Sequence, residues 1–323
     1  MSDAANNSGA TFPTIGVFDS GFGGLTVLRA LMAQLPRARY AFFGDTARLP
    51  YGSKSRRTIA RYAAQCAQFL VSEQGAEYLV IACNTASALA LDAIQDAVQV
   101  PVLGVIEPGA EAARAASRSG DVLVIATDAT VQSHAYAAAC RARGLRALEK
   151  ACPLLVPLVE EGWTGPLANA GNLTEAYAAQ AASAPPQVVA GPQVHVTAEV
   201  IRIYLAELIA EASAQGMKPD VLLLGCTHYP LLRPLLEGAV PPNMRVIDSA
   251  NATAEAAVKL FGQTETYKRS PSAKDPNAQF PSAKDPAAHV RCFATDSIEK
   301  FERLGSRFLG QPTGKVELVD LGG

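Results

Sequence analysis

The sequence feature that most constrains the fold is the stretch 220–232, which reads DVLLLGCTHYPLL. Its uninterrupted apolar run predicts a parallel β-strand that is buried on both faces, and the small and polar residues from Gly225 onward predict the end of that strand. In open α/β sheets, ligands bind outside the carboxyl ends of the strands. Cys226 is therefore predicted to lie where a reactive side chain would lie.

A second cysteine repeats this arrangement far upstream. Residues 77–86 read EYLVIACNTA, another apolar strand that ends on Cys83 among small and polar residues. An unpaired cysteine elsewhere usually behaves as a small buried hydrophobe, and we expect that role for Cys66, Cys140, Cys152 and Cys292. No C-x-x-C pair occurs, so the cysteines indicate neither a zinc knuckle nor a redox dithiol.

Length and composition predict two compact α/β domains, because 323 residues exceed the usual size of a single domain. Hydrophobic residues make up 49% of the chain, and 28 Lys and Arg are balanced by 30 Asp and Glu, which predicts a globular enzyme without a nucleic-acid partner. The first dozen residues lack the basic start and apolar centre of a signal peptide, and no apolar run is long enough to span a membrane. We therefore expect a cytoplasmic protein with no membrane partner, whose cysteines are thiols.

The order of the expected elements supports this fold class, because strands alternate with helices along most of the chain. Strands are expected over 14–18, 39–44, 79–82, 100–105, 121–127, 147–152, 220–225, 245–247 and 289–294. Helices are expected over 25–35, 56–74, 197–215 and 297–309, and a further helix is expected to follow Ser87 and to end near residue 98. The span 164–192 predicts a loop or short helices. The repeated PSAKDP at 271–276 and 281–286 predicts a flexible insertion over about 266–288 without a catalytic role.

A glycine-rich turn, Asp19-Ser20-Gly21-Phe22-Gly23-Gly24, follows the first strand and precedes a helix. The free N–H groups of such a helix start could bind an anion. The glycines match part of the dinucleotide-binding fingerprint, but Thr26 occupies the third glycine position and no Gly-Lys-Ser/Thr follows. A plain strand-to-helix turn explains these glycines equally well.

Two strand-end thiols in facing domains suit one chemistry in particular. If Cys83 and Cys226 approach a substrate carbon from opposite sides, one can remove a proton while the other supplies one. Inverting a stereocentre requires this pair of groups, and it requires no metal or organic cofactor.

Three other functions remain open at this point. Cys226 and His228 could form a nucleophilic pair for hydrolysis, since alternate residues of an extended segment point the same way, but Cys83 would then have no role. The same pair with Cys83 could bind a metal, although no close ligand spacing supports it. A two-domain amino-acid binding protein would leave both cysteines as packing residues.

Four motifs in this order and spacing resemble the cofactor-independent aspartate/glutamate racemase family, and bacterial glutamate racemases within it. They are Asp19-Ser20-Gly21, Pro50-Tyr51-Gly52, Ala82-Cys83-Asn84-Thr85 and Gly225-Cys226-Thr227-His228-Tyr229-Pro230, and the resemblance runs from about residue 14 to 310. It implies an isomerase that interconverts L- and D-glutamate without a cofactor or metal. The D-glutamate would supply peptidoglycan biosynthesis, and thereby cell wall formation and cell shape, and the resemblance also implies a possible homodimer.

The resemblance further implies an α/β fold of two similar domains, with mostly parallel sheets flanked by helices and an active site in the cleft between them. We expect a disordered leader over 1–12, a first domain of 13–104 plus 251–323, and a second domain of 105–250.

The resemblance also implies a set of site residues. The expected catalytic residues are Cys83 and Cys226, with Asp19 assisting the first and His228 the second. The expected substrate-binding residues are Asp19, Ser20, Pro50, Tyr51, Gly52, Asn84, Thr85, Thr227 and His228. Further candidates are Thr127 and Thr130, whose hydroxyls follow a strand, and Glu160, which together with Glu161 matches a family glutamate; without the resemblance, exposed carboxylates are the simpler expectation for these two acids.

Overall fold

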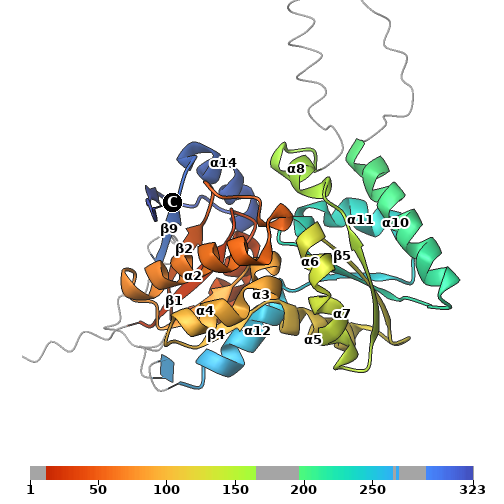
Figure 1. Cartoon of the computed structure of the whole chain (residues 1–323), viewed down its shortest axis with the longest axis horizontal. Coiled ribbons are helices and arrows are strands. Elements are labelled where there is room, and N and C mark those ends of the chain that lie inside the picture. The colour runs from red at the N-terminus through yellow and green to blue at the C-terminus, as the bar shows by residue number, and fades with distance from the viewer. Residues whose placement is uncertain (1–11, 165–195, 265–266, 269–288, 323) are drawn as a thin grey trace, which may run out of the picture.

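The computed structural model describes residues 12–164, 196–264, 267–268 and 289–322, and these form two parallel sheets flanked by helices (Figure 1). The six strands of the first sheet lie in the order β10-β9-β2-β1-β3-β4. The four strands of the second lie in the order β6-β5-β7-β8. All pairings between neighbouring strands are parallel. The expected α/β fold with two parallel sheets is confirmed.

The strand bounds follow the apolar runs of the sequence closely. The first sheet contains β1 (Thr14–Asp19), β2 (Arg39–Gly44), β3 (Tyr78–Ile81), β4 (Val102–Gly104), β9 (Val290–Ala294) and β10 (Val316–Leu318). The second contains β5 (Asp121–Ala126), β6 (Arg146–Ala151), β7 (Val221–Gly225) and β8 (Arg245–Asp248). Every residue of β1, β3, β5 and β7 is buried, because helices cover both faces of these central strands.

The helices around the first sheet include segments from both ends of the chain. They are α1 (Leu25–Gln34), α2 (Arg56–Ser72), α3 (Asn84–Leu89), α4 (Leu91–Ala97), α12 (Ala250–Phe261) and α14 (Ile298–Leu309). Those of the second sheet are α5 (Ile106–Ala116), α6 (Asp128–Ser133), α7 (Ala135–Arg141), α8 (Leu155–Glu160), α10 (Val196–Ala214) and α11 (Arg233–Ala239). This distribution is the one expected for a first domain built from two separate parts of the chain, while the boundaries near 104 and 251 stay a prediction.

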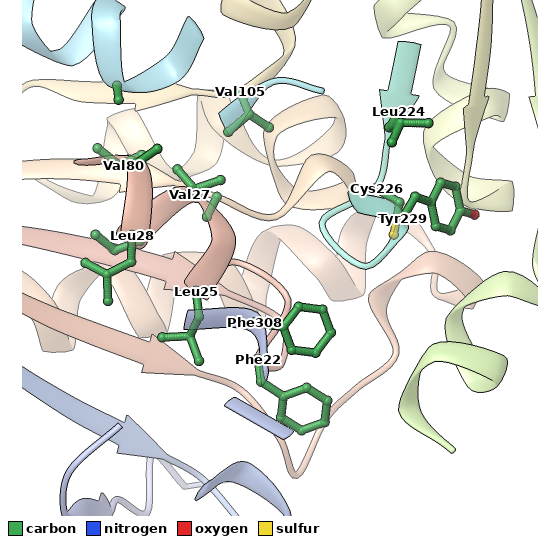
Figure 2. Packing of buried hydrophobic residues seen from close by; sticks show 14 of the residues in the cluster. Phe22, Leu25, Val27, Leu28, Val80, Val105, Leu224, Cys226, Tyr229 and Phe308 are labelled. Carbon is green, nitrogen blue, oxygen red and sulfur yellow. The ribbon is translucent and has the colours of Figure 1, made fainter. Parts of the chain in front are cut away.

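One hydrophobic core runs through both sheets and joins them. It includes Phe22, Leu25 and Phe308 on the side of the first sheet as well as Leu224 and Tyr229 on the side of the second (Figure 2). The amphipathic helix α14 presents Phe301 and Phe308 to Phe22, with ring centroids 6.1 and 6.2 Å away. The turn after β1 is therefore packed against α14 as well as against His228, which follows a strand of the second sheet.

Two local expectations need correction. The helix expected up to residue 98 is two helices, α3 and α4, because Ala90 between them leaves the helical conformation with φ −135° and ψ 5°. Strand β10 was not expected, since three residues are too short to show an alternating pattern.

Three expectations fall on other parts of the chain. All but the last residue of the leader over 1–12, most of the span 164–192 and nearly all of the insertion over 266–288 lie outside the described residues. Within the described residues, no helix has the length and apolar character needed to cross a membrane.

Candidate active site

Each candidate cysteine lies at the switch point of its sheet, where the connections from two neighbouring strands run in opposite directions. In the first sheet this point is between β1 and β3, and Cys83 follows β3. In the second sheet it is between β5 and β7, and Cys226 follows β7. Ligands of open α/β sheets bind at this position, because the loops diverge there and leave a crevice.

Cys83 is held by its own helix and by the turn after β1. It caps α3, with its Sγ 3.5 Å from the N–H group of Ala86, and its thiol donates a hydrogen bond to Oγ of Ser20 at 3.4 Å. Burial, and after it the negative charge of Asp19, raise the pKa of Cys83 to about 12. At neutral pH Cys83 is therefore a protonated thiol that can donate a proton.

Asp19 ends β1 and is almost completely buried. Its Oδ2 accepts a hydrogen bond from the N–H group of Gly21 at 3.0 Å, while its buried Oδ1 has no hydrogen-bond partner among the described residues. Burial raises the pKa of Asp19, and the positive charge of His228 opposes that effect. A buried acceptor without a partner is costly unless a ligand supplies a donor.

Cys226 shares its surroundings with His228. Nδ1 of His228 lies 4.0 Å from Sγ of Cys226 and 3.5 Å from Oγ1 of Thr227. The contact does not arise from an extended strand, as the sequence suggested, because His228 has helical φ and ψ and opens the 3-10 turn η2 (Tyr229–Leu232). Cys226 thus precedes a short turn, whereas Cys83 caps an α-helix.

Glu160, the last residue of α8, completes this group. Its Oε1 lies 3.3 Å from Nε2 of His228, and its Oε2 accepts from Nζ of Lys300 at 2.9 Å. Burial lowers the pKa of His228, but contacts with Cys226 and Glu160 raise it more, to about 10, so the imidazole is protonated at neutral pH. Burial raises the pKa of Glu160, and His228 and Lys300 lower it below its usual value.

Hydroxyl groups close the opposite side of the site. Oγ1 of Thr85 lies 3.0 Å from that of Thr127 and 3.2 Å from that of Thr130, and the last two are 2.9 Å apart. Beside them, the Tyr136 hydroxyl donates to Oδ1 of Asn84 at 2.6 Å, which fixes the orientation of the Asn84 amide. These groups follow strands of both sheets, so a bound carboxylate could contact residues of the two sheets at once.

The loop before α2 forms the rim. The peptide bond between Leu49 and Pro50 is cis. The Tyr51 hydroxyl donates to Oδ2 of buried Asp45 at 2.5 Å, and Asp45 also pairs with Arg48. Because Asp45 uses the Tyr51 hydroxyl, Tyr51 presents its backbone and ring rather than its hydroxyl to a ligand.

Both cysteines and many of the side chains around them line one cavity of about 40 Å³. A single water molecule needs roughly 10–15 Å³ of such volume, so this cavity accommodates a few waters but no amino acid. Its lining residues are Ser20, Gly21, Leu49, Pro50, Tyr51, Gly52, Cys83, Asn84, Thr85, Thr127, Val156, Glu160, Cys226, Thr227 and His228. A larger cavity of about 590 Å³ lies between α5, α12 and β8 and contains neither cysteine.

The structure brings the candidate residues from the sequence together with two differences. Asp19 and Thr130 do not line the cavity, but Asp19 raises the pKa of Cys83 and Thr130 contacts Thr85. Glu160 is directed into the site, whereas Glu161 is exposed, which corrects the simpler expectation of two exposed carboxylates. The four remaining cysteines are buried away from the cavity, as expected.

Sequence reasoning missed Gly21, Leu49 and Val156 of the lining, and Lys300 behind it, although Gly21 belongs to the Asp-Ser-Gly motif. Leu49 adjoins the Pro-Tyr-Gly motif and Val156 lies one helical turn before Glu160, so both could have been found by extending those segments. Nothing in the sequence around Lys300 indicates its contact.

The site can therefore donate and accept protons from two directions. One thiol, that of Cys83, is protonated, and the other, that of Cys226, has an imidazolium beside it. No group of three His, Cys, Asp or Glu side chains that could hold a metal ion is found in the part of the chain that the structure describes.

Comparison with known proteins gives one family. The family model described as Asp/Glu/hydantoin racemase matches residues 15–184. A glutamate racemase from Koribacter versatilis is 49% identical over 96% of this chain and 98% of its own length, and one from Geobacter metallireducens is 40% identical over 95% and 96%.

A solved structure shows the same likeness. The crystal structure of glutamate racemase from Francisella tularensis in complex with D-glutamate is 31% identical, covers 96% of this chain and 98% of its own, and superposes with a TM-score of 0.74.

Proposed function

This chain belongs to the Asp/Glu/hydantoin racemase family, and from that premise we propose that it interconverts L- and D-glutamate by proton transfer between Cα and the thiols of Cys83 and Cys226. The observation that carries the proposal is the position of the two thiols, each at the switch point of a different sheet, around one cavity. The relatives named glutamate racemase support glutamate as the substrate.

In one direction the Cys226 thiolate removes the Cα proton, and the Cys83 thiol delivers its own proton to the opposite face. The pair of electrons left on Cα is shared with the α-carboxylate until the second proton arrives. In the reverse direction Cys83 is the base, and its high pKa makes its thiolate a strong one. His228, whose Nδ1 lies 4.0 Å from Sγ of Cys226, assists Cys226 in both directions.

The polar groups around the cavity suit the rest of the substrate. Asp19 lies behind the lining, and its Oδ1, which has no partner among the described residues, can accept a hydrogen bond from the substrate ammonium group once the site opens to admit the substrate. The hydroxyls of Ser20, Thr85 and Thr227, together with the amide of Asn84 and backbone groups of the loop 50–52, can hold the carboxylates. Thr127 and Thr130 add hydroxyls from the second domain.

We also propose a setting for this activity. D-glutamate is a component of peptidoglycan, so the reaction would supply cell wall synthesis. The six cysteines are all thiols, which is typical of a reducing compartment and supports the cytoplasm. A homodimer stays a prediction from the family resemblance.

The test is racemisation by purified protein without added pyridoxal phosphate or metal. Circular dichroism should show that L-glutamate and D-glutamate both converge on zero signal, while L-aspartate and L-alanine change far more slowly. Loss of the circular dichroism signal with L-aspartate but not with glutamate would mean that aspartate, and not glutamate, is the substrate. No reaction together with tight glutamate binding would favour an amino-acid binding protein.

The protonation state of Cys83 makes a separate prediction. At pH 8 Cys83 is almost entirely a thiol, since its pKa is about 12. We expect iodoacetamide to modify Cys83 only slowly at pH 8, because the thiolate is the form that reacts. The rate at Cys83 should rise with pH up to about 12, because its thiolate fraction does. Peptide mass spectrometry over time measures this rate, and a rate that does not rise between pH 8 and pH 10 would contradict the high pKa of Cys83.

A further inference from the structure

The residue that the proposed mechanism leaves unused is Lys300, in the first turn of α14. Its Nζ lies 2.9 Å from Oε2 of Glu160, and the other oxygen of Glu160 contacts Nε2 of His228. Lys300 belongs to the first domain, whereas Glu160 and His228 belong to the second. The ion pair between Lys300 and Glu160 therefore crosses the cleft. Glu160 in turn contacts His228, the side chain beside Cys226.

Other contacts at this place show that His228 is held from both domains. The Phe22 and Phe308 rings of the first domain lie 6.2 and 5.1 Å from the His228 ring, centroid to centroid. A second polar contact crosses nearby, where Arg307 of α14 donates to Oγ1 of Thr164 at 3.0 Å, beyond the end of α8. Helix α14 is thus joined to α8 at one point and to the segment after α8 at another.

The placement of Lys300 is unfavourable for its own helix. A cation in the first turn opposes the helix dipole, which favours acidic residues such as the adjacent Glu299. Side chains that break a local rule without a local gain are expected at functional sites. Lys300 gains its ionic partner across the cleft, while its Nζ also lies 5.7 Å from the centroid of the Phe22 ring on its own side.

The small volume of the cavity implies that the ion pair between Lys300 and Glu160 breaks and re-forms when substrate enters. Glutamate does not fit into about 40 Å³, so the domains must separate to admit it and close again around it. Separation pulls Lys300 away from Glu160, which ends α8 and is then free to turn toward solvent. Closure returns Lys300 to Glu160 and so returns Glu160 to His228.

We propose that Lys300 is a positioning residue for the racemisation, holding Glu160 against His228 when the domains close and thereby preparing Cys226 for proton transfer. The inference rests on the proposed function. It assigns to Lys300 an effect on the step at Cys226 and none on the step at Cys83.

Replacing Lys300 by methionine removes the charge and keeps the aliphatic stem. We expect kcat to fall about tenfold, as happens when a residue that orients a reactive group is lost. KM should change less, because Lys300 does not line the cavity. Lys300→Arg should restore most of kcat, since arginine can also pair with Glu160. Arg303→Met, which removes an exposed cation from the same helix, serves as the matched control and should leave kcat unchanged.

Substrate isotope effects separate positioning from a general loss of structure. With α-deuterated L- and D-glutamate in turn, Lys300→Met should raise the isotope effect on kcat/KM for the enantiomer that Cys226 deprotonates and lower it for the other. The reason is that proton transfer at Cys226 becomes the slower of the two transfers. A kcat equal to that of wild type, an equal change in both isotope effects, or no rescue by arginine would overturn the positioning role. A wild-type protein that does not racemise glutamate would instead overturn the proposed function, and this inference with it.

Discussion

Replacing either Cys83 or Cys226 by serine is expected to lower kcat for glutamate racemisation by about 10³-fold, within the range that a general acid or base contributes. A serine hydroxyl is a far weaker acid than a thiol, so it can neither supply nor remove the Cα proton at a useful rate. Each variant still has one thiol in place. We therefore expect each to catalyse exchange of the Cα hydrogen with solvent for one enantiomer only, and the two variants to differ in which enantiomer that is.

A thiol outside the cavity provides the control. Cys140 in α7 is completely buried in the second domain, and Cys140→Ala should keep kcat while lowering the free energy of unfolding by about 1 kcal/mol, because it removes buried volume. Racemisation and exchange are both followed by NMR and circular dichroism. Unchanged racemisation in either serine variant would show that the reaction does not need two thiols.

The second large effect is expected at Gly23, in the turn after β1. A Cβ atom there would lie 2.3 Å from Oγ1 of Thr227 and 2.7 Å from Nδ1 of His228, closer than real contacts allow. Gly23→Ala should therefore push the two domains apart at the His228 side chain. We expect kcat/KM to fall about 100-fold, which is the cost of misplacing a catalytic group by about 1 Å. The unfolding free energy should fall by about 1–3 kcal/mol, as in overpacked cores.

Gly238 is the matched control, because a Cβ atom there meets nothing within 4 Å. Gly238→Ala lies in α11 and should leave kcat/KM unchanged, with equal or slightly higher stability, since alanine favours a helix more than glycine does. Steady-state kinetics and thermal unfolding measure both variants. Wild-type kinetics in Gly23→Ala would mean that the domains do not approach one another as closely as this structure has them.

Gly23 also shows why the glycine-rich turn was ambiguous in the sequence. The partial dinucleotide fingerprint and a plain turn both account for glycines after a strand. The structure provides a third reason, which is the close approach of Thr227 from the other domain. A contact between residues about two hundred positions apart leaves no local pattern, so it could not be predicted from composition or spacing.

The strands and the two cysteines could be predicted because their signal is local. Fully buried parallel strands need apolar residues at nearly every position. Strand β3 shows such a run just before Cys83, and β7 shows one just before Cys226. Glu160 is an intermediate case. The sequence left Glu160 and Glu161 as alternatives, and only the way in which α8 packs distinguishes the side chain that contacts His228 from the one that faces solvent.

The contacts that tune the thiols were less accessible from sequence. The high pKa of Cys83 depends on burial and on Asp19, and the protonated His228 depends on Glu160, so both require the folded arrangement. Lys300 is the clearest example, because its unfavourable position in the first turn of α14 is explained only by its ion pair with Glu160 of α8. Such tertiary contacts are the part of the site that a single sequence does not predict.

The most direct test of the central claim is the fate of the Cα hydrogen when wild-type protein acts on L-glutamate in D₂O. Two thiols on opposite faces predict that the first D-glutamate formed carries deuterium at Cα, while the remaining L-glutamate still carries hydrogen, as measured by ¹H NMR after separation of the enantiomers. Deuterium that enters L-glutamate as fast as D-glutamate, or product that retains the original hydrogen, would contradict a mechanism with one thiol on each face.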